Sequence, residues 1–97
     1  MKTEVEELIV EWDDAKDAIN FEKHCIHFSS AALVFTDENR LEFYDEKHSE
    51  TEDRFAVIGM VEDVLFVIYT ERKNNLRIIS ARLATKKEKE LYYGKNS

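Results

Sequence analysis

The sequence predicts an α+β fold in which a three- to four-stranded antiparallel sheet has two helices before it and one after it. Three apolar segments follow one another closely between residues 54 and 83, separated only by short polar turns, a pattern typical of an antiparallel meander. Segments with helix-capping residues lie before and after this region, so helices and strands are segregated along the chain. With 97 residues, of which 43% are hydrophobic, the chain can bury its own core, and we expect one domain spanning residues 1–97.

The first predicted elements are a short strand and the helix that follows it. Apolar and polar residues alternate over residues 8–12, which favours a strand with Trp12 anchored in the core. Asp13 or Asp14 supplies the N-cap of the helix, because a short carboxylate side chain accepts hydrogen bonds from the N–H groups of the first turn. We expect the helix to end near Cys25, and we expect this small side chain to be buried or half-buried.

The next segment is predicted to contain one short helix and one edge strand. The helix covers residues 31–35, and either Ser29 or Ser30 can act as its N-cap. Residues 36–53 are highly charged, and within them residues 41–44 alternate in the manner of a strand. This strand is expected at an edge of the sheet, followed by a polar loop.

The second half of the chain contains the meander itself. Its strands are predicted over residues 54–61, 64–70 and 76–83, and the middle one is almost continuously apolar, as suits a central strand covered on both faces. The first turn is Glu62-Asp63. The second turn uses Asn74-Asn75, because asparagine tolerates positive φ.

A final helix is predicted from Lys86 to about Tyr93. Thr85 stands three residues before Glu88, which is the spacing of a capping box. Gly94 then follows as a C-terminal cap.

The composition excludes several classes of protein. The single cysteine cannot form an internal disulfide, and no CxxC, HExxH or Cys/His cluster indicates a zinc site, so we expect neither a metal nor another cofactor. The N-terminal residues lack the apolar centre of a signal peptide, and no apolar run is long enough to cross a membrane. These features favour a cytoplasmic protein without membrane contact.

The charge balance is acidic but uneven. The net charge of −7 argues against a general nucleic-acid-binding protein, because phosphate attraction scales with positive charge. Residues 1–53 hold 16 acidic and 5 basic residues, whereas residues 54–97 hold 5 acidic and 9 basic residues. This asymmetry indicates either a basic working face or only a solvated surface with uneven charge.

Basic and polar side chains are concentrated on one face of the first predicted helix. The stripe stands at positions i, i+4, i+7 and i+8 and consists of Lys16, Asn20, Lys23 and His24. Three guanidinium groups follow late in the chain, those of Arg72, Arg77 and Arg82. Together these groups are suited to hold a phosphodiester and to move a proton near it. The structural alternative is that cations in the last helical turn are stabilised by the helix dipole.

A series of short motifs is spaced along most of the chain, from about Trp12 to Tyr93. In order they are Trp12-Asp13-x-x-Lys16-x-x-x-Asn20-x-x-Lys23-His24, Phe28, Asp45-x-x-His48-Ser49, Arg54-x-x-x-Ile58-Gly59, Tyr69-Thr70-x-Arg72, Arg77-Ile-Ile-Ser-Ala-Arg82, and Ala84-Thr85 with Glu88 and Tyr92-Tyr93. In this order and spacing the chain resembles the BrnT toxins of bacterial toxin–antitoxin pairs, which are placed among the RelE-like ribonucleases.

The resemblance implies a RelE-like fold and a ribonuclease that slows growth by cutting RNA. It also implies a partner, a BrnA-like antitoxin that holds the toxin inactive and carries a DNA-binding domain, so that this chain meets DNA only through the antitoxin. The sequence departs from the family at one position of interest. The family usually has glycine after the Lys-His pair, where this chain has Cys25.

Cleavage of RNA without a metal requires removal of the 2′-hydroxyl proton, stabilisation of the phosphorane and protonation of the leaving 5′-oxygen. An imidazole titrates near neutral pH, and a guanidinium offers a two-pronged fork to phosphate oxygens. The expected catalytic residues are therefore Lys23, His24, Arg72 and Arg82. The expected RNA-binding residues are Lys16, Arg54, Arg77 and Tyr92, with Tyr93 as the alternative for stacking on a base.

Strand geometry ranks the arginines. Five residues separate Arg77 from Arg82, so in a regular strand they point to opposite faces, and only one can be in the site unless the strand bulges or Arg82 lies past its end. Arg72 and Arg82 are therefore ranked above Arg77. The remaining histidines, His27 and His48, are interpreted as a loop residue and a turn residue.

A second function, from a different class, remains open. In this alternative the chain is a catalytically weak binding module that acts mainly as partner and corepressor of a DNA-binding protein. The acidic first half of the chain and Cys25 in the glycine position favour it.

Overall fold

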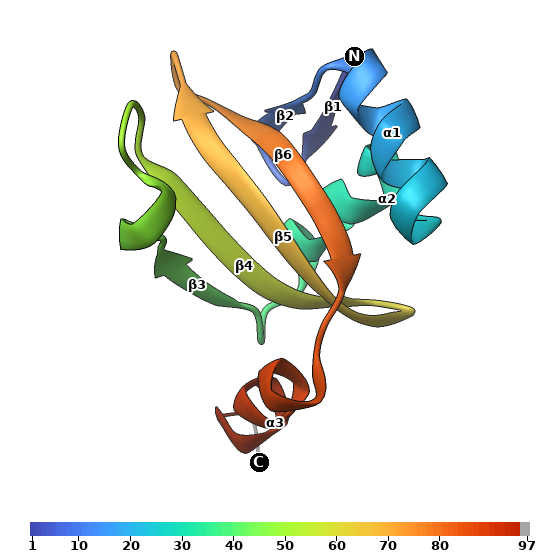
Figure 1. The fold of residues 1–97 in the computed structure, drawn as a ribbon, viewed down its shortest axis with the longest axis vertical. Coiled ribbons are helices and arrows are strands. Elements are labelled where there is room, and N and C mark those ends of the chain that lie inside the picture. The colour runs from blue at the N-terminus through green and yellow to red at the C-terminus, as the bar shows by residue number, and fades with distance from the viewer. Residues whose placement is uncertain (96–97) are drawn as a thin grey trace.

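The computed structural model describes residues 1–95, which form an α+β fold around a six-stranded mixed sheet (Figure 1). The strand order across the sheet is β1-β2-β6-β5-β4-β3. The strands are β1 (Lys2–Val5), β2 (Leu8–Glu11), β3 (Leu41–Tyr44), β4 (Arg54–Val61), β5 (Asp63–Arg72) and β6 (Asn75–Leu83). The helices are α1 (Asp14–His24), α2 (Phe28–Ala31) and α3 (Lys86–Lys95), with 3-10 helices at η1 (Ala32–Thr36) and η2 (Glu46–His48).

The predicted meander is confirmed as β4, β5 and β6, and β3 pairs with the edge of β4. The turn between β5 and β6 differs from the prediction by one residue. Lys73 and Asn74 have φ values of 48° and 72°, and Asn75 already opens β6. Two consecutive left-handed residues match the twist of the flanking strands, which is why they form the tight hairpin.

The prediction of three to four antiparallel strands is wrong at the other edge of the sheet. β1 was not predicted, and it pairs antiparallel with β2 through a two-residue turn at Glu6 and Glu7, both with positive φ. Glutamates are unusual in such a turn, so the sequence lacks the glycine or asparagine signal of a hairpin. β2 then joins β6 in parallel, with Glu11 opposite Arg77, so the sheet is mixed.

Helix α1 begins as predicted and ends in a strained conformation. The Asp13 carboxylate caps it by accepting hydrogen bonds from the N–H groups of Ala15 (2.8 Å) and Lys16 (3.1 Å). Cys25 terminates the helix with φ 58° and ψ 29°, and its N–H donates to the Phe21 carbonyl. Contrary to the sequence prediction, the Cys25 side chain is exposed.

The second helical segment starts earlier than predicted and is capped differently. It begins at Phe28, whose N–H donates to Asp17 Oδ1 of α1 at 2.7 Å, so neither predicted serine is the cap. The segment continues as η1, which packs on β4. A Cβ at Gly59 would come within 3.1 Å of Val34 Cβ, so the glycine permits this close approach.

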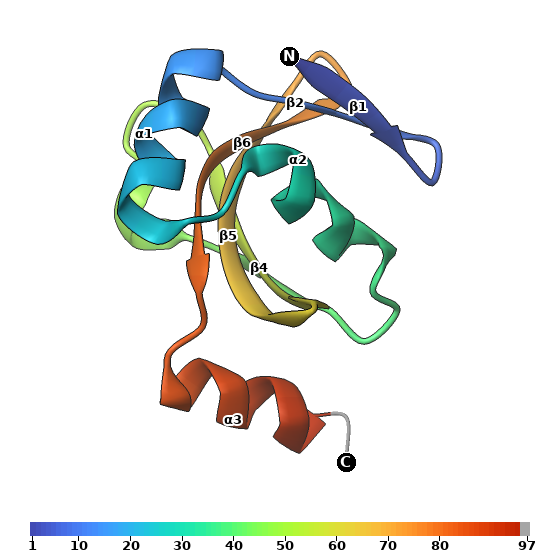
Figure 2. The same cartoon turned by 90° about the vertical axis from the view of Figure 1, so that its right-hand side faces the viewer.

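The two faces of the sheet are covered unequally (Figure 2). α2 and η1 cover one face and enclose the main core, which contains Phe28 and Phe35 and confirms Trp12 as a core anchor. α3 packs on one end of the opposite face, where Tyr92 meets Ile58. Beside α3, a cavity lies on this second face.

The C-terminal helix confirms the predicted capping box. The Thr85 N–H donates to Glu88 Oε1 at 2.8 Å, and the Glu88 N–H donates to Thr85 Oγ1 at 3.2 Å. Gly94 is not the C-cap that we predicted, because α3 continues through it to Lys95. None of the helices within residues 1–95 combines the length and the apolar character needed to span a membrane.

Candidate functional site

Helix α1 lies beside the part of β6 that extends past its pairing with β2, and Asn20 fixes it there. The Asn20 side chain is only 6% exposed, and its Oδ1 accepts a hydrogen bond from the Ala81 N–H at 3.1 Å. Its Nδ2 donates to the carbonyls of Ala81 (2.9 Å) and Ile26 (3.0 Å). One side chain thus satisfies backbone groups that a neighbouring strand would otherwise pair, and Asn20 has a structural role in the predicted stripe.

The other three stripe residues, Lys16, Lys23 and His24, are exposed. Together with Asn20 they border a small cavity of about 190 Å³ that also contacts Ile79 and Ser80 of β6. The structure therefore brings the predicted stripe together. Neither lysine forms an ion pair within residues 1–95, so both ammonium groups are available to a ligand.

A bulge in β6 places Arg77 and Arg82 on the same face of the sheet. The ladder with β5 skips Ile79, so Arg82 lies opposite Phe66 and Arg77 lies opposite Thr70. Positions 66 and 70 share one face of β5, and residues that lie opposite each other share a face as well. The sequence analysis had named such a bulge as one condition under which both arginines could lie on the same face.

Arg77 is nevertheless outside the site. Its Nη1 lies 2.9 Å from Glu11 Oε2, at the junction of β2 and β6, and it lines neither cavity. Arg72 lies at the β5–β6 hairpin, where its Nη2 pairs with Glu52 at 3.2 Å, and it lies outside both cavities too. Of the three arginines expected to clamp a phosphate, the larger cavity contains Arg82 alone.

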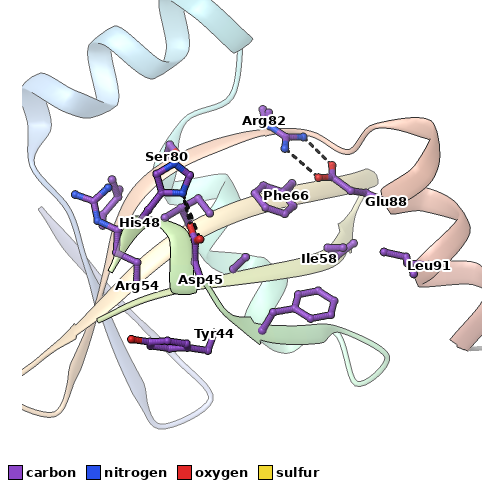
Figure 3. A pocket seen from close by; sticks show the side chains of 14 residues that line it. Tyr44, Asp45, His48, Arg54, Ile58, Phe66, Ser80, Arg82, Glu88 and Leu91 are labelled. Atoms are coloured by element: carbon purple, nitrogen blue, oxygen red, sulfur yellow. Dashed lines mark hydrogen bonds and ion pairs between the residues drawn. The ribbon is translucent and has the colours of Figure 1, made fainter. Parts of the chain in front are cut away.

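This larger cavity, of about 660 Å³, lies on the open face of the sheet (Figure 3). Its floor is apolar and includes Ile58 and Phe66. It shares Ile79 and Ser80 with the smaller cavity, so the α1 stripe borders the same stretch of β6. Its charged side chains and its imidazole are those of Asp45, His48, Arg54, Arg82 and Glu88.

Arg82 is held firmly at one end of this cavity. Its guanidinium makes two hydrogen bonds to the Glu88 carboxylate, at 2.7 and 3.0 Å, and lies 4.2 Å from the centre of the Phe66 ring. The hydrogen bonds from Arg82 hold the pKa of Glu88 below its usual value. A phosphate that binds Arg82 must therefore share its guanidinium with Glu88 or displace the Glu88 carboxylate.

Arg54 is the cation of the cavity without an internal partner. It stands at the start of β4 and forms no ion pair within the described residues. By the register of β4, Arg54 lies opposite Thr70 and shares the face of Arg82. It is therefore placed to contact an anion over the open face.

Tyr92 is unsuited to the stacking role expected of it. The residue is 5% exposed, and its hydroxyl donates to Asp37 Oδ2 at 2.6 Å. Burial of the ring and this hydrogen bond raise the pKa of Tyr92 to about 12. Tyr93 is 54% exposed, so the alternative stacking residue is the one with a ring open to solvent.

The cavity also contains Asp45 and His48, a pair that the sequence analysis quoted as a motif but to which it gave no functional role. The His48 Nδ1 lies 3.0 Å from Asp45 Oδ2, beside Arg54 and across the cavity from Arg82 (Figure 3). The signal was present as Asp45-x-x-His48, because residues three apart share a face of a 3-10 turn. The sequence analysis gave this motif no role because it lies in a charged segment that we interpreted as a polar loop, with His48 as a turn residue.

No group of three or more histidine, cysteine, aspartate or glutamate side chains within residues 1–95 is placed to hold a metal ion. The candidate site gathers basic side chains, the imidazoles of His24 and His48, and the carboxylates of Asp45 and Glu88 around the bulge of β6.

Comparisons with known proteins identify the family and a structure of similar fold. Residues 12–88 match the model of a family described as the ribonuclease toxin BrnT of type II toxin–antitoxin systems. The crystal structure of the Brucella abortus ribonuclease toxin BrnT is similar in fold, with a TM-score of 0.62 and 23% sequence identity over 79% of this chain and 96% of that one. No curated protein matches the sequence.

Proposed function

This chain belongs to the BrnT family of ribonuclease toxins of type II toxin–antitoxin systems, and from this premise we propose that it is a metal-independent endoribonuclease that inhibits growth. In this proposal residues 1–97 act as one domain in the cytoplasm, and RNA is the substrate. A BrnA-like antitoxin neutralises the toxin and makes the contact with DNA. A type II toxin implies a protein antitoxin, and the BrnA type is the one we propose.

The observation that carries the proposal is the clustering of cations in an otherwise acidic chain. Lys16, Lys23 and His24 border one cavity, Arg54 and Arg82 line the next, and both cavities meet at the bulge of β6. A phosphodiester that lies over this bulge would meet cationic groups from both sides. Such groups stabilise the extra negative charge of a phosphorane.

The proposed reaction is a transesterification within the RNA backbone. The 2′-oxygen loses its proton and attacks phosphorus, the bond from phosphorus to the 5′-oxygen breaks, and the 5′-oxygen gains a proton. The products are a 2′,3′-cyclic phosphate and a 5′-hydroxyl. His24 transfers a proton, while Lys23 and Arg82 stabilise the phosphorane.

The remaining residues divide into RNA contacts and residues outside the proposed site. Lys16 and Arg54 hold the RNA backbone, and Tyr93 replaces Tyr92 as the residue that stacks on a base. Arg72 is left out of the catalytic group and Arg77 out of the RNA-binding group, because each is paired with a glutamate away from the cavities.

The test is growth after controlled induction of the chain without its antitoxin, with total RNA analysed on a gel. We expect the wild type to arrest growth and degrade RNA. His24→Ala and Arg82→Ala should each relieve the arrest, because the first removes a proton-transfer group and the second removes phosphate stabilisation. Mapping of the cleaved ends should find a cyclic phosphate in the presence of a chelator.

His27→Ala is the matched control, because His27 is also an exposed histidine near the end of α1 but lines neither cavity of the site. It should leave the arrest unchanged. Persistent arrest in both His24→Ala and Arg82→Ala would contradict the assigned residues. Since Arg82 also holds Glu88, circular dichroism must show that Arg82→Ala is folded.

One observation favours the alternative, a catalytically weak module that acts mainly as partner and corepressor of a DNA-binding protein. The three late arginines are each paired with a glutamate of this chain, so a phosphate must compete with a carboxylate for each of them. This alternative predicts binding to the antitoxin, normal growth and intact RNA on induction. RNA cleavage by the pure protein that is lost in His24→Ala would exclude it.

A further inference from the structure

The proposed ribonuclease leaves one chemical role unfilled. Transesterification needs one group that accepts the 2′-hydroxyl proton and another that gives a proton to the 5′-oxygen. The catalytic residues expected from the sequence contain a single imidazole, that of His24. A second group that exchanges protons near neutral pH must therefore be sought on the same face.

The pair Asp45 and His48 is built in a way that local structure does not explain. Asp45 precedes η2, but its carboxylate makes no capping hydrogen bond to that helix. Within the described residues its only hydrogen-bond or ion-pair partner is the His48 Nδ1, at 3.0 and 3.3 Å from the two oxygens. The carboxylate side chain is 19% exposed and the imidazole 63%, so the acid is screened while the ring is open to the cavity.

A second aspartate–histidine pair in the same chain shows what a structural pair looks like. Asp17 lies 3.3 Å from the His27 Nδ1, but the same carboxylate also caps α2 through the Phe28 N–H. The His27 ring is stacked on Phe21 with centroids 3.9 Å apart. Each member of that pair thus has a packing or capping role, whereas within residues 1–95 the Asp45 and His48 side chains form hydrogen bonds and an ion pair only with each other.

The segment that carries His48 is also held in place. Ser49 Oγ donates to the Asp45 carbonyl and accepts a hydrogen bond from the Arg54 N–H at 2.9 Å. The Asp45 N–H donates to the Arg54 carbonyl at 2.8 Å. These bonds fix η2 against the start of β4, so the imidazole and the Arg54 side chain enter the cavity from one rigid unit.

We propose that His48, oriented by Asp45, is the general base of this ribonuclease. With the Nδ1 proton donated to Asp45, the His48 Nε2 carries the lone pair and accepts the proton of the 2′-hydroxyl. His24, in the neighbouring cavity on the other side of Ile79 and Ser80, donates its proton to the 5′-oxygen as the bond from phosphorus to that oxygen breaks. The inference rests on the proposed function and assigns the two proton transfers within it.

The test uses the purified full chain and an RNA that the wild type cleaves, in two chemical forms. The second form carries sulfur in place of the leaving 5′-oxygen, because a thiolate leaves without needing a proton. His48→Gln should slow cleavage of both forms by about 10²–10⁴-fold, the usual loss for a missing general base. His24→Gln should slow the oxygen form similarly but recover most of its rate on the sulfur form.

Asp45→Asn tests the positioning role. It should lower kcat and leave KM within about twofold, because the carboxylate orients His48 and does not touch RNA. Free imidazole should restore part of the activity of His48→Gly, and a residue with only a structural role would not respond in this way. His27→Gln is the matched control and should cleave both forms at the wild-type rate.

The outcomes separate this inference from the proposed function. If the wild type cleaves RNA and folded His48→Gln matches it, or if the sulfur form rescues His48→Gln, then His48 is not the base and the proposed function stands. If the wild type cleaves no RNA, alone or with ribosomes, the proposed function and this inference both fail.

Discussion

Cys25 is the residue where sequence and backbone conflict most clearly. It ends α1 with φ 58°, in the left-handed region where a Cβ clashes with the neighbouring backbone and where helix ends usually carry glycine. The chain therefore adopts the backbone conformation of the glycine cap while carrying a side chain. This strain lies directly after Lys23 and His24, at the end of the helix that presents them.

Cys25→Gly should stabilise the protein by about 0.5–1 kcal/mol, because relief of the left-handed strain exceeds the added flexibility of the unfolded chain. For a domain of this size the thermal midpoint should rise by about 2–8 °C, which calorimetry can measure. Cys25→Ala is the matched control, since it removes the same exposed thiol but keeps the Cβ. An equal gain in both variants would mean that the thiol, and not the backbone, is the source.

Asn20 contributes to the stability of the fold, a role that the sequence analysis did not predict when it placed this residue in a functional stripe. Asn20→Ala would leave the Ala81 N–H and carbonyl unpaired at the edge of β6, and it should destabilise the fold by about 2–3 kcal/mol. Chemical denaturation measures this loss. Asn75→Ala, which removes one partly buried hydrogen bond to Glu11, should cost about 1 kcal/mol or less. Similar losses in the two variants would refute the anchoring role of Asn20.

Residues of this kind mark the limit of prediction from sequence. Helical spacing correctly placed Lys16, Asn20, Lys23 and His24 on one stripe, but it could not show that Asn20 faces a strand edge sixty-one positions away. Ion pairing was likewise invisible, because Arg72 and Arg77 meet acids that are distant in sequence. Sequence spacing predicts which residues share a face of a helix or strand. Which other residues contact that face depends on the tertiary fold.

At the scale of the elements, two carboxylates connect α3 to the sheet, those of Asp37 and Glu88. Burial by itself would raise the pKa of Asp37, but hydrogen bonds from Tyr92 and the Met60 N–H outweigh it and hold the pKa below its usual value of 3.8. Hydrogen bonds from Arg82 hold the pKa of Glu88 below its usual value of 4.5. Both carboxylates bind protons less tightly when α3 is docked.

Docking of α3 should therefore weaken in acid. Because the folded pKa values are depressed, their contribution is fully present above the unfolded carboxyl pKa of about 4 and is lost as the pH falls through the lower folded values. An NMR titration that follows the two carboxyl carbons and the α3 amides measures the effect. Tyr92→Phe should raise the apparent pKa of Asp37. An unchanged pKa would show that the hydrogen bond from the tyrosine hydroxyl is not what lowers it.

The elements were predicted to different degrees for physical reasons. The meander and the capping box of α3 are encoded locally, in apolar runs and in the Thr85–Glu88 spacing, and both are confirmed. β1 was missed because its turn uses two glutamates, and α2 was mis-capped because its cap, Asp17, belongs to another helix. The bulge at Ile79 has no sequence signature either, although it decides which arginines share a face.

At the scale of the whole molecule, an acidic protein is proposed to bind a polyanion. The net charge of −7 repels RNA at long range, so binding must depend on the few cations around the β6 bulge. Four of these, Lys16, Lys23, Arg54 and Arg82, border the two cavities, and Arg82 is already paired with Glu88. The small number of available cations sets how strongly salt should weaken binding.

We expect the logarithm of the RNA association constant to fall against the logarithm of salt concentration with a slope of about −2 to −3, because each phosphate neutralised on a single strand contributes about −0.7. A cleavage-resistant 2′-O-methyl RNA permits the measurement by fluorescence anisotropy. Lys16→Ala should weaken binding and make the slope shallower by about 0.7. Lys2→Ala, which removes the same charge from an exposed position of β1, should change neither quantity. Equal effects of the two variants would mean that RNA responds to the net charge of the molecule and not to a site on its open face.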